Sequence, residues 1–202
     1  MQVSINEKPV PVNFSHIRNL EEALAELNDR FVPPGEQVFQ IRVNGEFFSE
    51  RYPRESRYVS LKEINTLEIT TIPDTQMARV ILAEAGVQAG VLCQAIAQSA
   101  RLFRVASEEE ANHYFAQVLE ALRWLLLTGE HACRVLQVDL VKALPPNGEP
   151  ESHYLKRMQD LLEEMGEIHE DLDYVLLADL MEYELLPMVR EWQEVLENLA
   201  RQ

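Results

Sequence analysis

The amino-acid sequence predicts an α+β protein: a small β-sheet module over residues 1–72, followed by an all-α bundle of about four helices over residues 74–202. The first observation is a change of pattern at Ile72–Pro73. Before it, short period-two runs, which are typical of half-buried strands, surround one stretch with helical spacing. After it, apolar residues recur at intervals of three and four, as in amphipathic helices. A chain of 202 residues is long enough for two domains, so we expect a boundary at this change.

The first half of the N-terminal module reads as a hairpin and a helix. Residues 1–5 and 10–14 alternate apolar and polar side chains on either side of a short turn, which predicts two paired strands. Asn19 is expected to cap a helix whose apolar positions run from Leu20 to Phe31. The helix should end at Pro33-Pro34-Gly35, because proline lacks a backbone donor and glycine tolerates left-handed turns.

The second half of the module reads as a further hairpin and a closing strand. Residues 38–43 form the strongest strand pattern of the chain, and Asn44-Gly45 is a favoured two-residue turn. Residues 46–48 should return as a short strand. We expect an irregular loop over residues 49–60 and the last strand over residues 66–72.

This order of elements resembles the β-grasp fold of ubiquitin and the sulfur-carrier proteins. The phrases that carry the resemblance are Met1-Gln2-Val3, Pro33-Pro34, Asn44-Gly45 and the stretch Glu63–Ile69. The resemblance implies an exposed sheet face that can serve as a docking surface, although the module can equally pack only on the bundle or on a sister subunit. Conjugated and sulfur-carrying members end in a Gly-Gly tail, whereas this chain has no Gly-Gly and continues past Ile72. Their chemical activity is therefore not expected.

The first two bundle helices have clear starting signals. Asp74 can cap a helix that begins near Gln76, and Ser107 forms a capping box with Glu110. In the first helix, bulky apolar residues are expected at core positions, and the small residues between them allow close packing of another helix, as in Gly86-x-x-x-Gly90. The bulky positions are Met77, Ile81, Val87, Val91 and Ile96. The second helix either breaks at Gly129 or continues through Leu136, Leu140 and Leu144.

The last third of the chain should contain one or two more helices. Pro145-Pro146-Asn147-Gly148 predicts a loop, and a helix follows from about Glu151. The stretch Asp171–Asp173 either separates two helices or lies inside one long helix. The final helix has a coiled-coil-like apolar stripe, and Pro187 inside it should kink it or end a segment. The stripe consists of Leu177, Met181, Leu185, Met188, Trp192, Val195 and Leu199.

The charge of the chain limits its partners. The net charge is −16, and residues 1–72 carry 11 acids against 8 bases while the remainder carries 23 against 10. Nucleic acids and anionic membranes bind through clustered lysine and arginine, so we expect neither as a partner. No run of 18 apolar residues and no signal peptide is apparent, and two cysteines do not make a disulfide framework. These observations predict a cytoplasmic protein.

An acidic face near the C-terminus is the candidate partner-binding site. Glutamates and aspartates crowd one side of the predicted helix around residue 165, and two further acids lie opposite the apolar stripe of the last helix. The candidate residues are Asp160, Glu163, Glu167, Glu170, Asp179 and Glu182. We expect either a solvated face or a dock for a basic or amphipathic segment of a protein partner.

Motifs for catalysis are sparse. Glu110-Ala111-Asn112-His113 is one match to the Glu-x-x-His pattern of di-metal bundles, which need two such motifs and two more glutamates. Cys93 and Cys133 lie in apolar helical contexts without a neighbouring base, so we expect buried structural thiols. The sequence therefore predicts a non-enzymatic adaptor, scaffold or chaperone-like protein without a cofactor, self-associating as a homo-oligomer such as a dimer. The alternative is a metal-binding bundle that uses Glu110, His113 and bundle carboxylates.

Overall fold

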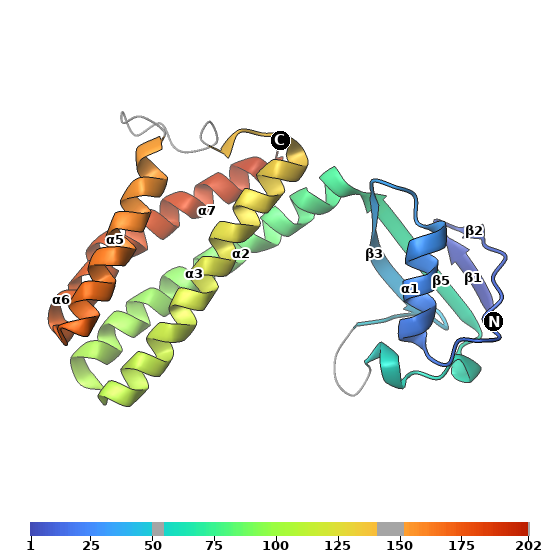
Figure 1. The fold of residues 1–202 in the computed structure, drawn as a ribbon, viewed down its shortest axis with the longest axis horizontal. Coiled ribbons are helices and arrows are strands. Elements are labelled where there is room, and N and C mark those ends of the chain that lie inside the picture. Colours follow the sequence, from blue (N-terminus) through green and yellow to red (C-terminus); the bar gives the residue numbers. More distant parts are fainter. Residues whose placement is uncertain (50–54, 141–151, 202) are drawn as a thin grey trace. The chain divides into compact units, whose positions relative to one another are not determined.

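The computed structural model describes residues 1–49, 55–140 and 152–201 (Figure 1). It contains two compact units, Met1–Met77 and Ala78–Gln202. The first unit is a mixed β-sheet with one helix, and the second is helical. The predicted α+β class is therefore confirmed.

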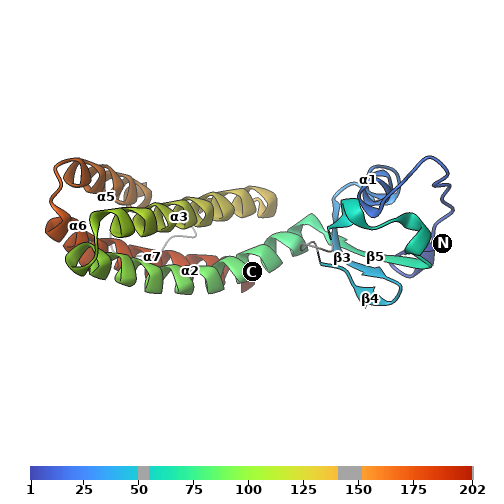
Figure 2. The same cartoon turned by 90° about the horizontal axis from the view of Figure 1, so that it is seen from below.

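The first unit has a five-stranded sheet in a β-grasp-like order. The strands are β1 (Gln2–Ile5), β2 (Lys8–Pro9), β3 (Glu36–Val43), β4 (Glu46–Phe47) and β5 (Thr66–Pro73). They lie in the order β2-β1-β5-β3-β4, with β1 and β5 parallel and the other pairs antiparallel. Helix α1 (Leu20–Phe31) covers one face of the sheet (Figure 2), and two short 3-10 turns, Ser56–Tyr58 and Leu61–Glu63, precede β5.

The register of the strands separates an apolar face from a polar one. Val3 pairs with Leu67 and Ile5 pairs with Ile69, and all four side chains are buried in the core with Leu27 of α1. The neighbouring row has polar or exposed side chains, because successive residues of a strand point to opposite faces. That row consists of Ser4, Glu68, Arg42 and Phe47, and the guanidinium carbon of Arg42 lies 4.2 Å from the centroid of the Phe47 ring.

The predicted strand over residues 10–14 is wrong. Asn6 and Glu7 both have positive φ, 48° and 64°, and form a tight turn that returns the chain early, so the second strand is Lys8–Pro9. The pairing ends after the backbone N–H of Val10 donates to the carbonyl oxygen of Val3 at 2.9 Å. Pro11 has no N–H with which to extend the ladder.

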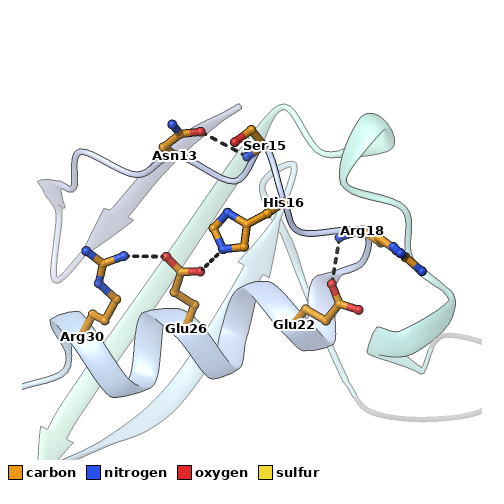
Figure 3. Close-up of polar contacts among 7 residues, drawn as sticks. All are labelled: Asn13, Ser15, His16, Arg18, Glu22, Glu26 and Arg30. Atoms are coloured by element: carbon orange, nitrogen blue, oxygen red, sulfur yellow. Dashed lines mark hydrogen bonds and ion pairs between the residues drawn. The ribbon is translucent and has the colours of Figure 1, made fainter.

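Instead of pairing in the sheet, the following segment is held against α1 by polar contacts (Figure 3). His16 Nε2 lies 3.0 Å from Glu26 Oε2, and Arg30 Nη1 lies 2.8 Å from Glu26 Oε1. The predicted cap is confirmed: Asn19 Oδ1 accepts from the N–H of Glu22 at 2.9 Å, and Glu22 Oε2 accepts from the N–H of Arg18 at the same distance. The C-terminal part of this connection, from His16 to Asn19, is therefore fixed by polar contacts with the first two turns of α1.

Other local signals of the module are also confirmed. Helix α1 ends at Phe31, two residues before Pro33, and Gly35 has a φ of +84°. Asn44 and Gly45 have φ values of 53° and 83°, as a two-residue hairpin turn requires. Only residues 49 and 55–60 of the predicted loop lie within the described part, and residues 56–58 form the first 3-10 turn.

The second unit is built from long helices. They are α2 (Asp74–Val105), α3 (Glu108–Leu136), α5 (Ser152–Glu170), α6 (Tyr174–Leu180), a π-helical turn η3 (Met181–Leu185) and α7 (Leu186–Arg201). Because α6, η3 and α7 follow one another without a break, the described residues form about four helical rods. All seven residues of the predicted stripe in the last rod are buried.

The open alternatives along the bundle are now settled. Helix α3 does not break at Gly129, but it ends at Leu136 and does not continue to Leu140, so neither alternative holds in full. Gln137 after it adopts a left-handed conformation with a φ of 56°. Asp171–Asp173 separates two helices, because Leu172 has a φ of 60° and Asp173 Oδ1 caps α6 by accepting from the N–H of Leu176 at 3.1 Å. Leu144 and the loop predicted at residues 145–148 lie outside the described residues.

Glycines set how closely the rods approach. A Cβ on Gly86 would lie 3.0 Å from Glu197 Cγ of α7, and one on Gly90 would lie 3.5 Å from Gln193 Nε2. The small residues of α2 therefore pack against α7, as predicted. The tightest contact is between α3 and α7, where a Cβ on Gly129 would lie 2.5 Å from Trp192 Cζ2.

Candidate functional site

The structure places the six predicted acidic residues in two groups. Asp160, Glu163, Glu167 and Glu170 are exposed along α5. Asp160 Oδ1 lies 3.8 Å from Lys156 Nζ, and Glu163 Oε1 accepts from Gln159 Nε2 at 2.8 Å, both within the same helix. These contacts are those of a solvated helix surface.

The other two acidic residues are held by a basic residue from α2. Arg104 Nη2 lies 2.7 Å from Asp179 Oδ1, and Arg104 Nη1 lies 2.8 Å from Glu182 Oε2. The two hydrogen bonds raise the pKa of the Arg104 guanidinium above its ordinary value. Asp179 and Glu182 therefore link the rod of α6 and η3 to the end of α2.

The residues of the predicted metal site do not come together with further ligands. Glu110 lies in the first turn of α3, where its N–H donates to Ser107 Oγ at 3.3 Å and completes the predicted cap. His113 is exposed, and its Nε2 lies 3.0 Å from Gln117 Nε2. Across residues 1–49, 55–140 and 152–201, no three histidine, cysteine, aspartate or glutamate side chains are arranged to hold a metal ion.

The two thiols are buried, as predicted, and unpaired with each other. Burial raises the pKa of the Cys93 thiol, while the nearby Arg190 guanidinium opposes this rise. Burial also raises the pKa of the Cys133 thiol, and Asp139 adds to the effect. Thiols that resist ionisation are poor nucleophiles, which suits a structural role.

An aromatic cluster, which the sequence did not indicate, closes one end of the bundle. His169 stacks on Phe115 with ring centroids 5.9 Å apart, and its Nε2 donates to Asn112 Oδ1 at 2.8 Å. Phe103 stacks on Tyr174 at 5.2 Å, and the hydroxyl of Tyr174 donates to Glu108 at 2.7 Å. In both hydrogen bonds the donor and the acceptor are about 60 positions apart in the sequence. No local sequence motif could therefore have revealed these pairs.

A groove of about 470 Å³ runs between α2 and α3. Its floor and walls are mostly apolar, and Glu84 is its one charged residue. The lining residues are Glu84, Gln88, Val91, Leu92, Ala95, Tyr114, Gln117, Val118, Ala121, Trp124 and Leu125. With the adjacent Val87, these residues form a surface that we call the α2/α3 face. Val87, Val91 and Trp124 are 61%, 54% and 47% exposed.

The exposure of this face corrects the sequence analysis. Ile81, Val87 and Val91 were expected in the core, but all three are exposed, and Ile96 is fully buried as expected. The side of α2 that packs against the bundle carries its small residues, whose short side chains let α7 approach. Val80, Ile81, Val87 and Val91 are left on the outside, whereas Leu82, Leu92 and Ile96 are buried. The signal available in the sequence was the absence of charge: between Arg79 and Arg101, Glu84 is the only charged residue.

The same charge-poor stretch makes α2 long and apolar enough to cross a membrane by length and composition. This is weak support for a membrane span, because a core helix of a soluble protein passes the same test. In the bundle, 39% of the most apolar 18-residue window is buried. The exposed residues of α2 include the apolar Val80, Ile81, Val87 and Val91, with Glu84, Gln88 and Gln94 among them.

A second groove, of about 450 Å³, lies between α3 and α5. Leu126, Leu127, Met158 and Leu162 contribute to its apolar lining, with Trp192 beneath. Glu163, one of the predicted acidic residues, lies at this groove. Thus apolar surface flanks α3 on both sides.

The comparisons with known proteins found a family model that matches each of two parts of the chain. Residues 2–72 match the model of a domain of unknown function, DUF8043, and residues 89–195 match that of a second domain of unknown function, DUF8042. No curated protein and no solved structure matches the chain. Since the second match spans more than half of the 202 residues, the chain belongs to the DUF8042 family.

Proposed function

We propose that this protein acts as an adaptor or scaffold that binds another polypeptide chain through the α2/α3 face. The observation that carries the proposal is the groove in which Val91 of α2 and Trp124 of α3 are about half exposed. In addition, α2 has one charged residue in the 21 positions between Arg79 and Arg101. Interface cores are depleted of charged side chains and enriched in aromatic ones, which matches this composition.

The energetics favour covering this surface. Completing the burial of a half-exposed valine or tryptophan contributes about 1 kcal/mol, so Val87, Val91 and Trp124 together supply about 3 kcal/mol. Trp124 at the rim of a preformed groove has the character of an interface hot spot, since it offers a large rigid area with little conformational entropy to lose. A polypeptide helix fits the groove between two helices better than a flat surface would.

The N-terminal module supplies a second surface in this proposal. Its strand order supports the resemblance to ubiquitin-like modules, whose exposed sheet face serves for docking. On this chain that face carries Arg42 stacked on Phe47, flanked by Glu68 and Ser4. Such a polar face suits a weaker, more selective contact than the α2/α3 face. Binding of a basic segment by the acidic residues of α5, and a cytoplasmic location, stay predictions.

Cysteine accessibility tests whether another chain covers the α2/α3 face. Val91→Cys and the control Val175→Cys introduce thiols at positions 54% and 64% exposed, and the native thiols are buried. Maleimide labelling is measured in freshly opened cells at native concentration and again in purified, highly diluted protein. We expect Val91→Cys to be protected only in the cell extract, with Val175→Cys labelled equally in both. Equal labelling of the two variants in the extract would rule the proposal out.

A further inference from the structure

The solvent side of α2 carries an eight-residue seam with coiled-coil spacing. Its members are separated alternately by four and three positions, as in the a and d positions of a heptad repeat. They are Val80, Glu84, Val87, Val91, Gln94, Gln98, Arg101 and Val105. Gln98 is half-buried and the other seven are exposed, so the seam faces away from the protein's own bundle.

The seam is symmetric about its midpoint, between Val91 and Gln94. We infer that a second copy of this chain binds here, with the two α2 helices antiparallel around a two-fold axis; this inference names the partner and rests on the proposed function. In an antiparallel coiled coil each a position lies opposite a d position of the other helix. Val91 then meets the other copy's Gln94, Val87 meets its Gln98, and Val80 meets its Val105.

The charges of the seam select this orientation. The third layer from the axis pairs Glu84 of each copy with Arg101 of the other, which brings opposite charges together twice in the dimer. A parallel arrangement would instead place Glu84 against Glu84 and Arg101 against Arg101. Among the described residues neither side chain is in an ion pair, and Glu84 Oε1 accepts only from Gln88 Nε2 at 2.9 Å. The two charged groups are thus available for the contact.

The flanks of the seam permit a close approach. On one side Ala83 and Ala97 are exposed, and their small size lets a second helix backbone come near, while Gly90 between them faces Gln193 of α7. On the other side the α2/α3 groove, with Trp124 at its rim, receives side chains of the neighbouring copy. From Ile81 to Ala97 the one charged residue is Glu84, which belongs to the seam itself. Most of the net charge of −16 therefore lies outside the contact.

The available area matches that of a stable interface. The seam spans 25 steps of an α-helix from Val80 to Val105, which is about 38 Å. Together with the rim of α3 the face is about two helix diameters wide, so it covers about 760 Å² on each copy, close to the ~800 Å² of a standard-size interface.

A charge swap tests the inference with purified protein. The mass in solution is measured by light scattering and sedimentation for the wild type, Glu84→Arg, Arg101→Glu and the double swap. We expect twice the chain mass of 23.3 kDa for the wild type, a dissociation constant weakened at least about tenfold in each single variant, and recovery in the double swap. Circular dichroism checks that the exposed substitutions leave the bundle folded.

The register is tested by mixing two variants, each of which adds one cysteine to the buried native Cys93 and Cys133. In the antiparallel pair, Val87→Cys of one copy lies opposite Gln98→Cys of the other, whereas two Val87→Cys positions are about 16 Å apart along the axis. Mild oxidation should therefore yield a disulfide-linked dimer only in the mixture of the two variants. A parallel pair would crosslink Val87→Cys with itself, which would overturn the inference.

The two proposals fail in different ways. A monomeric wild type at about 100 µM, or single charge variants that dimerise like the wild type, would refute the second copy as partner. Protection of Val91→Cys in the cell extract would then still support a different protein on the α2/α3 face. Binding of a basic partner to this chain of net charge −16 would weaken with added salt.

Discussion

Replacing Gly129 with alanine should destabilise the bundle, although glycine inside a helix usually costs stability. Gly129 is buried in α3, and a Cβ there would lie 2.5 Å from Trp192 Cζ2 and 3.3 Å from Leu196 Cδ2. The Trp192 ring is fully buried, stacks on Tyr154 at 6.1 Å, and donates from Nε1 to the carbonyl oxygen of Leu125 at 3.4 Å. The stack on Tyr154 and the hydrogen bond to the Leu125 carbonyl oxygen therefore resist a shift of the ring.

The magnitude follows from two opposing effects. Alanine gains about 1 kcal/mol in helix propensity over glycine. Overpacking a filled core costs about 1–3 kcal/mol, and a contact 1 Å shorter than van der Waals distance against a fixed ring belongs at the upper end. We expect a net loss of about 1–2 kcal/mol in the free energy of unfolding. Gly166 in α5 is the matched control, because its Cβ would meet no atom within 4 Å; Gly166→Ala should stabilise by about 0.5–1 kcal/mol.

Urea unfolding followed by tryptophan fluorescence measures both changes, since both tryptophans lie in the bundle. Trp192→Phe removes the ring atom that the new methyl group meets, so the loss caused by Gly129→Ala should shrink in that background. A Gly129→Ala protein as stable as Gly166→Ala would show that the close approach of α3 and α7 is not what requires glycine at this position.

Three further predictions concern single polar groups. Burial is the main cause that raises the pKa of the Tyr154 phenol, and the Glu191 charge adds to it. Folding therefore favours the neutral phenol. The resulting contribution to the free energy of unfolding is complete below the unfolded pKa of about 10 and is lost as pH rises. Tyr154→Phe, which also loses the 2.6 Å hydrogen bond to the Met188 carbonyl, should be about 1 kcal/mol less stable at pH 7 but decline less between about pH 9 and 11 in urea titrations. Ser107→Ala should cost about 1 kcal/mol in thermal unfolding because it removes the acceptor for the Glu110 N–H, whereas Ser107→Asp should retain stability. Arg104→Ala should cost about 0.5–1 kcal/mol, and the cost should fall at high salt; a salt-independent loss would mean that the Arg104 side chain acts through packing.

The parts of the fold that could be predicted from the sequence are those decided by neighbouring residues. The caps at Asn19 and Ser107, the turn at Asn44-Gly45 and the helix end before Pro33 depend on backbone donors and φ values within a few positions, and all four are confirmed. The second strand was misplaced because Asn6-Glu7 turns the chain without glycine. Two successive non-glycine residues with positive φ leave little trace in a sequence.

The candidate site was harder to predict because it depends on which helix packs where. Val87 and Val91 have the spacing of core residues, and only the contact of Gly86 and Gly90 with α7 shows that the opposite side of α2 is buried. Similarly, the acidic pair Asp179 and Glu182 could be identified as polar, but its engagement by Arg104 joins residues more than 70 positions apart. Periodicity tells which residues share a side of a helix, and tertiary contacts decide which side faces water.

The π-helical turn at Met181–Leu185 has a consequence for how this rod tolerates change. Successive spacings of four residues, as from Leu177 to Met181 and on to Leu185, over-rotate an ideal α-helix by about 40° each. In the wider π-helical turn each residue advances by a smaller angle about the helix axis, so the apolar stripe returns to its original side of the rod. The turn lies just ahead of Pro187, whose ring would otherwise crowd the carbonyl oxygen one turn earlier. Such a turn is one surplus residue stored inside a helix. This segment is therefore where a one-residue difference in length would be absorbed with least harm to both halves of the rod.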